Sequence, residues 1–164
     1  MTREGILEAA ALIFSEKGFH ATSMQDIADA VNLQKASLYY HFSSKQEILL
    51  ALLDHALDIL IDRLEIVLSQ TLTPDEKLRQ AMSSYLQTIA ENQNLYAVLL
   101  LELRALDPEL KARHAIRRDK FERLWRNLIA EGKEKGLFSC ADPSLAGRAL
   151  LGVMNWTVTW YRKD

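Results

Sequence analysis

Apolar residues recur along most of this chain at the three- and four-residue spacing of amphipathic helices. In the first such segment, from about Arg3 to Lys17, the side chains of Ile6, Ala10 and Phe14 fall on one face, and Gly18 follows as a stop signal. No segment alternates convincingly between apolar and polar residues, as a strand would, and the chain contains only six glycines and three prolines. The sequence therefore predicts an all-α fold.

Residues 22–45, TSMQDIADAVNLQKASLYYHFSSK, predict two short helices joined by a tight turn. Ser23 and Asp26 have the spacing of a capping box at the start of the first helix. Asn32 fits the turn because asparagine tolerates the left-handed backbone conformation. The second helix is expected from about Gln34 to Tyr40. This layout is that of a helix-turn-helix, whose second helix enters the major groove of DNA.

The outward side chains of the second helix have the chemistry of DNA recognition. Near its N-terminal end a glutamine can pair with adenine, a lysine with guanine, and an alanine methyl group can touch thymine. Hydroxyl, imidazole and ammonium donors follow, and these suit phosphate oxygens. The alternative is a three-helix packing unit whose tyrosines are merely half-buried. The predicted DNA-contacting residues are Ser23, Gln34, Lys35, Ala36, Ser37, Tyr39, Tyr40, His41 and Lys45.

The N-terminal segment resembles the DNA-binding domain of TetR-type transcriptional regulators over about residues 3–50. The family often has glycine at the position of Ala36; alanine is small enough for a similar approach to DNA, although base preference there could differ. The resemblance implies a three-helix DNA-binding domain over residues 1–46, joined by a fourth helix to a helical ligand-binding and dimerisation domain over residues 47–164. It rests on Ala9-Ala10, Phe14, Gly18-Phe19, Thr22-Ser23, Ile27-Ala28, Val31, Leu38-Tyr39-Tyr40-His41-Phe42 and Lys45.

Further helices are expected along the rest of the chain. A fourth helix should run from about Ser44 to Ser69, and Thr73-Pro74-Asp75-Glu76 has the pattern of another helix start. Residues 95–106 predict a short, almost entirely apolar helix that should be buried. A long helix should follow from residue 107 to about 135, with a kink near Gly132 considered for it.

The final helix is expected to begin at Asp142-Pro143-Ser144 and to continue past Trp160. Its large apolar side chains either pack on another subunit or are covered where the natural chain continues. The family resemblance implies one more helix after this point and a four-helix interface between two copies. We therefore expect a homodimer and a C-terminal domain that lacks its last helix. The predicted interface residues are Leu145, Ala149, Val153, Trp156 and Trp160.

The resemblance also implies that the helices after the fourth surround a ligand cavity. The candidate lining is apolar and aromatic with few polar groups, as in pockets for hydrophobic small molecules. The alternative is that these side chains are simply core. The candidates are Met82, Tyr85, Leu86, Ile89, Tyr96, Leu99, Leu103, Phe121, Trp125, Met154 and Asn155.

Residues 111–126 hold seven lysines and arginines against two acidic residues. This segment is interpreted either as a solvated helix face with ion pairs or as a basic rim for an anionic ligand such as an acyl-CoA. It resembles the TetR-type subgroup that regulates fatty-acid, steroid or other lipid metabolism.

Composition narrows the class of protein further. No apolar run approaches the length that spans a membrane, and the single Cys140 cannot form an internal disulfide, which fits the cytoplasm. No metal-binding, nucleotide-binding or nucleophile motif is present, so we expect neither an enzyme nor a cofactor. The net charge of −2 does not by itself indicate DNA binding.

The favoured hypothesis is a homodimeric repressor that a hydrophobic small molecule releases from a palindromic operator in double-stranded DNA. The alternative is a helical scaffold protein without an inducer.

Overall fold

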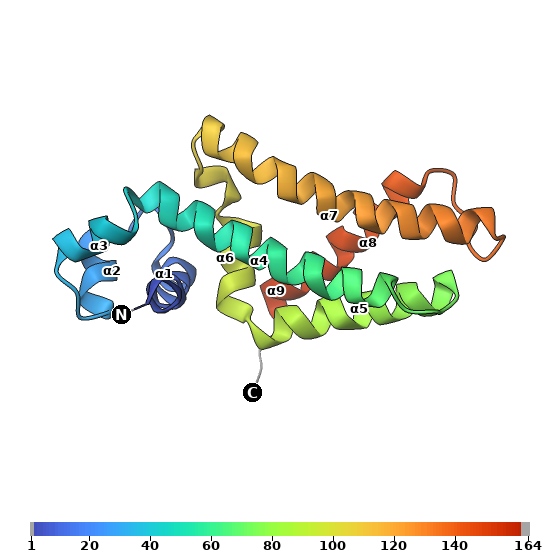
Figure 1. Ribbon diagram of the computed structural model, residues 1–164, viewed down its shortest axis with the longest axis horizontal. Helices are drawn as coiled ribbons and strands as arrows, with labels where there is room; N and C mark the ends of the chain where they lie inside the picture. The colour runs from blue at the N-terminus through green and yellow to red at the C-terminus, as the bar shows by residue number, and fades with distance from the viewer. Residues whose placement is uncertain (1, 162–164) are drawn as a thin grey trace. The chain divides into compact units, whose positions relative to one another are not determined.

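A computed structural model describes residues 2–161 and confirms the all-α prediction, with no strand among those residues (Figure 1). The helices begin and end close to the positions that the caps predict. They are α1 (Arg3–Lys17), α2 (Met24–Ala30), α3 (Lys35–His41), α4 (Lys45–Leu68), α5 (Pro74–Glu91), α6 (Gln93–Leu101), the 3-10 helix η1 (Leu103–Ala105), α7 (Pro108–Glu134), α8 (Pro143–Asn155) and α9 (Thr157–Trp160).

The helices form two compact units. The N-terminal unit comprises Met1–Ala56 with Gln93–Ala115, and the C-terminal unit comprises Leu57–Asn92 with Ile116–Asp164. Helices α4 and α7 each begin in the N-terminal unit and end in the C-terminal unit. These units are groups of residues that contact one another, and their boundaries differ from the predicted functional boundary at residue 46. That functional boundary stays a prediction. Helix α6 and the start of α7 therefore belong with the helix-turn-helix.

Local backbone chemistry sets the ends of the first helices as predicted. Gly18 ends α1 with φ +80°, a conformation that glycine adopts without a Cβ penalty. Ser23 and Asp26 form the expected capping box at the start of α2. Asn32, in the turn between α2 and α3, has φ +53°, and within the described residues no other non-glycine residue has positive φ.

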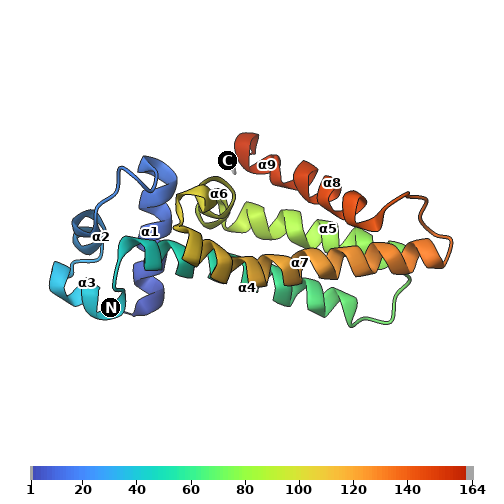
Figure 2. The same ribbon diagram turned by 90° about the horizontal axis from the view of Figure 1, so that it is seen from above.

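The core of the N-terminal unit is built on α1, against which α6 packs (Figure 2). Tyr96 on α6 is fully buried, and its hydroxyl donates to the carbonyl oxygen of Ala56 at 3.2 Å. The helix predicted over residues 95–106 is wrong in extent, because α6 ends at Leu101 and a separate 3-10 turn follows. Leu101 is 52% exposed, so this segment is not buried on all sides.

In the C-terminal unit, α8 packs against α5 and the second part of α7 (Figure 2). Helix α5 starts with the predicted capping box of Thr73 and Glu76. Helix α7 runs without interruption through Gly132 to Glu134, and the kink considered near Gly132 stays a prediction. A Cβ atom at Gly132 would overlap the ring of Phe138, which gives this glycine a packing role.

The single final helix predicted from residue 142 past Trp160 is wrong. Helix α8 ends at Asn155, and the short α9 follows after Trp156. At this point the hydroxyl of Thr157 donates to the carbonyl oxygen of Met154 at 2.7 Å. Trp156 between the two helices keeps helical dihedral angles, φ −58° and ψ −23°, so the interruption is confined to this one residue. The last part of that prediction, residues 162–164, lies outside the described residues.

Candidate nucleic-acid interface and internal cavity

Helix α3 presents its N-terminal residues to solvent and anchors itself through one buried leucine. The predicted readers Gln34, Lys35, Ala36 and Ser37 are all accessible to solvent, whereas Leu38 is completely buried. Because these four residues precede and open the helix, they lie at the end that reaches base edges in a helix-turn-helix. The structure therefore brings the predicted readers together on one free surface.

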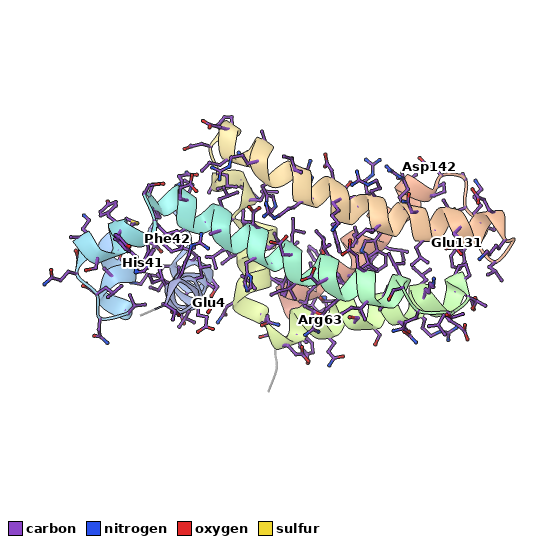
Figure 3. The ribbon with its side chains drawn as sticks, viewed as in Figure 1. Glu4, His41, Phe42, Arg63, Glu131 and Asp142 are labelled. Atoms are coloured by element: carbon purple, nitrogen blue, oxygen red, sulfur yellow. The ribbon has the colours of Figure 1, made fainter. Side chains whose placement is uncertain are left out.

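The predicted phosphate-binding aromatic residues lie at the other end of α3. Tyr40 is 88% exposed and Tyr39 is 46% exposed, so neither tyrosine belongs to the core. Their predicted contacts with phosphates stay predictions. The ring of His41 stands edge-on to that of Tyr40, with centroids 5.4 Å apart. Phe42, beside His41 in Figure 3, is buried and carries the guanidinium of Arg3 over its ring at 4.6 Å.

The ammonium of Lys45 is committed to the turn before α2. It donates to the carbonyl oxygens of Phe19 and Thr22, at 2.7 and 2.5 Å, and lies 4.3 Å from the centroid of the Phe19 ring. Burial lowers the pKa of this ammonium, while the nearby carboxylate of Asp26 acts in the opposite direction. An ammonium has three N–H donors, and the two carbonyl contacts use two of them. The third could still reach a phosphate, so the predicted DNA contact of Lys45 stays a prediction.

Ser23 also has partners inside the protein. Its hydroxyl donates to the carboxylate of Asp26 at 2.6 Å and accepts from the Asp26 backbone nitrogen at 3.1 Å. The hydrogen bond from the Ser23 hydroxyl is the main cause that holds the pKa of Asp26 below its ordinary value of 3.8. The DNA contact predicted for Ser23 stays a prediction, and its hydroxyl serves the helix cap.

Two polar side chains that the sequence did not single out join the segment after α6 to the turn between α1 and α2 and to the start of α4. The carboxylate of Glu102 accepts from the backbone nitrogen of Phe19 at 3.3 Å. The amide of Gln46 donates to the carbonyl of Ala105 at 2.8 Å and accepts from the backbone nitrogen of Asp107 at 3.1 Å. The partners of both side chains are far apart in sequence, so no local pattern could have indicated them.

An ion pair and a second polar contact join the first part of α7 to α4 within the same unit. Arg113 lies 3.1 Å from the carboxylate of Glu47. His114 is 2% exposed, and its Nδ1 lies 2.8 Å from the carboxylate of Asp54. These contacts hold the first turns of α4, which follow the helix-turn-helix directly, against the first part of α7.

Three further basic residues of the 111–126 segment, Arg117, Arg118 and Lys120, pair with carboxylates in the C-terminal unit. Arg117 lies 3.0 Å from Asp58, and Lys120 lies 2.7 Å from Glu65, both on α4. These pairs favour the interpretation as a helix face with ion pairs. The basic rim for an anionic ligand stays a prediction.

A small cavity lies inside the C-terminal unit, with a volume of about 10 Å³, enough for one water-sized molecule. Three predicted ligand-binding residues, Tyr85, Phe121 and Trp125, line it and contact one another through their rings. The full lining is Leu60, Arg63, Leu64, Ala81, Ser84, Tyr85, Thr88, Phe121 and Trp125.

The other predicted ligand-binding residues do not line this cavity. Leu86 is 37% exposed on α5, and Ile89 and Met154 are buried elsewhere in the C-terminal unit. Asn155 accepts a hydrogen bond from the hydroxyl of Tyr85 and so joins α8 to α5. The residues outside the lining are Met82, Leu86, Ile89, Met154 and Asn155 in the C-terminal unit, and Tyr96, Leu99 and Leu103 in the N-terminal unit. Their ligand contacts stay predictions.

Two polar groups of the cavity lining were not predicted from the sequence. Arg63, labelled on α4 in Figure 3, donates to the hydroxyl of Thr88 at 2.7 Å and pairs with Glu91 at 3.2 Å. The indole nitrogen of Trp125 is buried and has no hydrogen-bond partner among the residues that the structure describes. Neither the contacts of Arg63 nor the missing partner of Trp125 could be predicted from the sequence, because both depend on how the helices pack.

The outer side of α8 and α9 is apolar and open to solvent. Leu145 is 65% exposed, Val153 74%, Trp156 67% and Trp160 62%, and Ala149 is exposed between them. Exposed contiguous apolar surfaces of this kind mark interaction sites.

Comparisons with known proteins match both halves of the chain to one family. The model for "Bacterial regulatory proteins, tetR family" matches residues 6–52, and the model for "Tetracyclin repressor-like, C-terminal domain" matches residues 71–164. The chain is 31% identical over 162 residues to the HTH-type transcriptional repressor KstR2 of Mycobacterium tuberculosis, covering 98% of this chain and 81% of that protein.

Solved structures agree with these matches. The TetR family transcriptional regulator PfmR from Thermus thermophilus is 40% identical and has a TM-score of 0.90 over 97% of this chain and 87% of that chain. AibR, solved in complex with isovaleryl coenzyme A and operator DNA, is 27% identical and has a TM-score of 0.91 over 99% of this chain and 88% of that chain. No helix in residues 2–161 has the length and apolar character needed to cross a membrane.

Proposed function

Since the chain belongs to the TetR family of bacterial transcriptional regulators, which are not enzymes, we propose that it is a homodimeric repressor released from a palindromic operator by a hydrophobic small molecule. The observation that carries the DNA-binding part is the free surface at the start of α3. Four small or polar side chains, Gln34–Ser37, are accessible there while Leu38 anchors the helix in the core. Such a repressor acts where the chromosome is, in the cytoplasm.

In this proposal the two ends of α3 have different roles. Gln34, Lys35, Ala36 and Ser37 read base edges in the major groove, and Lys35 supplies the charged donor for guanine. Tyr39, Tyr40 and His41 contact phosphates and fix the register of the helix on the duplex.

Two copies of the motif bind one operator. A helix-turn-helix dimer places its recognition helices about one DNA turn, roughly 34 Å, or a small multiple of it apart. The exposed apolar side of α8 and α9 supports dimerisation through this surface, because Val153 and Trp156 would otherwise stay in contact with water.

The effector is proposed to bind in the C-terminal unit. The aromatic cavity of Tyr85, Phe121 and Trp125 supports this, as does the similarity to AibR, whose structure contains isovaleryl coenzyme A. The apolar chain of an acyl-CoA, a fatty acid or another lipid matches the character of this lining, and its binding requires the cavity to widen. A ligand that binds one conformation better shifts the population toward it, and it weakens DNA binding by the same differential affinity.

The two units are covalently joined by continuous helices, which supports coupling between effector and DNA. Helices α4 and α7 each contribute residues to both units. In the N-terminal unit α4 follows the recognition motif directly and is fixed to α7 by the Arg113–Glu47 and His114–Asp54 contacts.

A gel-shift series in rising salt tests the proposal, with DNA from upstream of the protein's own gene and a random duplex as competitor. Phosphate contacts give a linear fall of log affinity with log salt concentration, so we expect that dependence together with preference for the upstream DNA. Lys35→Ala should reduce the preference. Absence of binding to any duplex at low salt would favour a helical scaffold protein instead.

A further inference from the structure

Two cations near the recognition helix α3 have no ion-pair or side-chain hydrogen-bond partner among residues 2–161. Four lysines and arginines occur from the start of the chain to the first residue of α4. Lys17 lies 3.8 Å from the carboxylate of Asp26, and the Lys45 ammonium donates to two carbonyl oxygens. The other two, Arg3 and Lys35, are exposed to solvent. Their charges are therefore available to an anion outside the protein.

The guanidinium of Arg3 lies at the C-terminal end of α3. It is held over the ring of Phe42, 4.6 Å from the ring centroid. Phe42 directly follows α3, is 3% exposed and donates its backbone N–H to the carbonyl oxygen of Leu38 at 3.0 Å. The first turn of α1, which carries Arg3, is capped by the Thr2 hydroxyl, which accepts from the backbone nitrogen of Gly5 at 3.2 Å. Both the backbone and the head group of this arginine are thus positioned.

The contact with the ring leaves the hydrogen-bonding capacity of the guanidinium unused. A cation over an aromatic face is attracted by the electrons of the ring, which requires no hydrogen-bond acceptor. The five N–H donors of a guanidinium form a planar fork that matches the oxygens of a phosphate. A head group that is already held in place loses less conformational entropy on binding. Arg3 is therefore suited to bind a phosphate.

The neighbouring side chains indicate that this phosphate belongs to DNA. Tyr40, on the last turn of α3, is 88% exposed, and the ring of His41 stands edge-on to it. Figure 3 shows His41 and Phe42 together at the end of the helix. Lys35 begins the same helix of seven residues, about 10 Å away at 1.5 Å per residue. Because successive phosphates of one DNA strand are about 3.4 Å apart along the helix axis, the cations at the two ends of α3 reach different phosphates.

We propose that Arg3 binds a phosphate of the DNA backbone at the C-terminal end of α3, so that a cation at each end fixes this helix on the duplex. The inference rests on the proposed function, because the phosphate belongs to the DNA that α3 binds. A phosphate contact carries no sequence information, so Arg3 contributes equally to binding of the operator and of a random duplex. In a homodimer the contact occurs twice.

The test measures the affinity of the full chain by fluorescence anisotropy on two labelled duplexes, the DNA upstream of its own gene and a random sequence. Arg3→Met removes the charge and keeps a long unbranched side chain. Each lost phosphate contact should reduce the slope of log affinity against log salt by about 0.9, or by about 1.8 for a dimer. Between about 50 and 200 mM salt, the unchanged protein should therefore lose about twelvefold more affinity than the variant, on both duplexes.

Two further variants separate the charge of Arg3 from other effects. Arg79→Met makes the same substitution at an exposed position of α5 in the C-terminal unit, so it changes the net charge equally and should leave the slope unchanged. Arg3→Lys keeps the charge but loses the planar fork, so it should keep most of the slope and bind more weakly than the unchanged protein at every salt concentration. Circular dichroism should be the same for all of these proteins.

An unchanged slope in Arg3→Met would overturn the proposal. A reduced slope on the upstream DNA alone would also overturn it, because Arg3 would then act through the base sequence. The repressor function fails by a different result, equal affinity of the unchanged protein for the two duplexes, and that result would leave a reduced slope in Arg3→Met intact. Absence of binding to both duplexes at the lowest salt would overturn both proposals.

Discussion

The Lys45 ammonium lies 2.7 Å from the carbonyl oxygen of Phe19, at the turn that leads from α1 to α2. It also lies over the Phe19 ring, 4.3 Å from its centroid. On the amide side of the same residue, the Glu102 carboxylate accepts from the Phe19 nitrogen. The turn that positions the helix-turn-helix is therefore held through both backbone groups of one residue, from α4 and from just beyond α6.

Replacing Lys45 by methionine should destabilise the protein and weaken DNA binding together. Both carbonyl contacts are lost, at a cost of about 1–3 kcal/mol for part-buried groups left without a charged donor. Urea unfolding measures the stability. The matched control is Lys35→Met at a solvent-accessible position, which should change stability by less than about 0.5 kcal/mol and still reduce DNA affinity. Unchanged stability of the Lys45 variant would show that the contact with Phe19 contributes little.

Glu102 allows the other side of the turn to be tested. Glu102→Leu removes the acceptor for the Phe19 N–H and should cost about 1 kcal/mol, whereas Glu102→Gln keeps an oxygen acceptor and should cost less. Amide hydrogen exchange at Phe19 gives the local readout: faster exchange in Glu102→Leu than in Glu102→Gln. Equal exchange rates in the two variants would contradict the assigned role.

The capping box of α2 should make stability depend on pH at the acid end. The Ser23 hydroxyl and backbone hold the pKa of Asp26 below 3.8, so the folded protein binds this proton less readily than the unfolded chain. The resulting stabilisation is fully present above pH 3.8 and is lost as pH falls through the lowered pKa. Asp26→Asn should therefore flatten this part of the stability profile, measured by urea unfolding between pH 2.5 and 6 against the unchanged protein. An identical acid slope in both proteins would contradict this assignment.

Local chemistry allowed much of the fold to be predicted from the sequence. The Ser23–Asp26 box, the left-handed Asn32 and the Gly18 stop depend only on neighbours within a few residues, and each lies where the sequence placed it. The interruption after Asn155 was not predicted because the apolar spacing continues across it and Trp156 keeps helical dihedral angles.

The DNA-binding surface and the cavity were predictable only in part, because some of their contacts join residues far apart in the sequence. The accessible readers of α3 follow from helical periodicity around Leu38. The internal role of Lys45 depends on carbonyl groups more than twenty residues away, and the apolar spacing of α5 and α7 does not distinguish Tyr85 at the cavity from Leu86 at the surface. Contacts of this range are decided by packing between helices.

The apolar side of α8 should carry the dimer. Val153→Asp places a charge on a side chain that is 74% exposed, so it should leave the helical circular dichroism unchanged and convert the dimer to a monomer at micromolar concentration. Sedimentation velocity measures the oligomer. Ser83→Asp, at an exposed position of α5, is the control and should remain dimeric. A dimer that persists in Val153→Asp would move the interface elsewhere.

Nuclease footprinting on the DNA upstream of the protein's own gene tests the central claim most directly. The account predicts a protected region with two half-sites in inverted repeat, separated by about one helical turn or a small multiple of it. Lys35→Ala and Tyr40→Ala should remove the protection while the folded structure is kept, because both side chains are accessible to solvent. Protection that is unchanged in both variants, or its absence with the unchanged protein, would contradict the account.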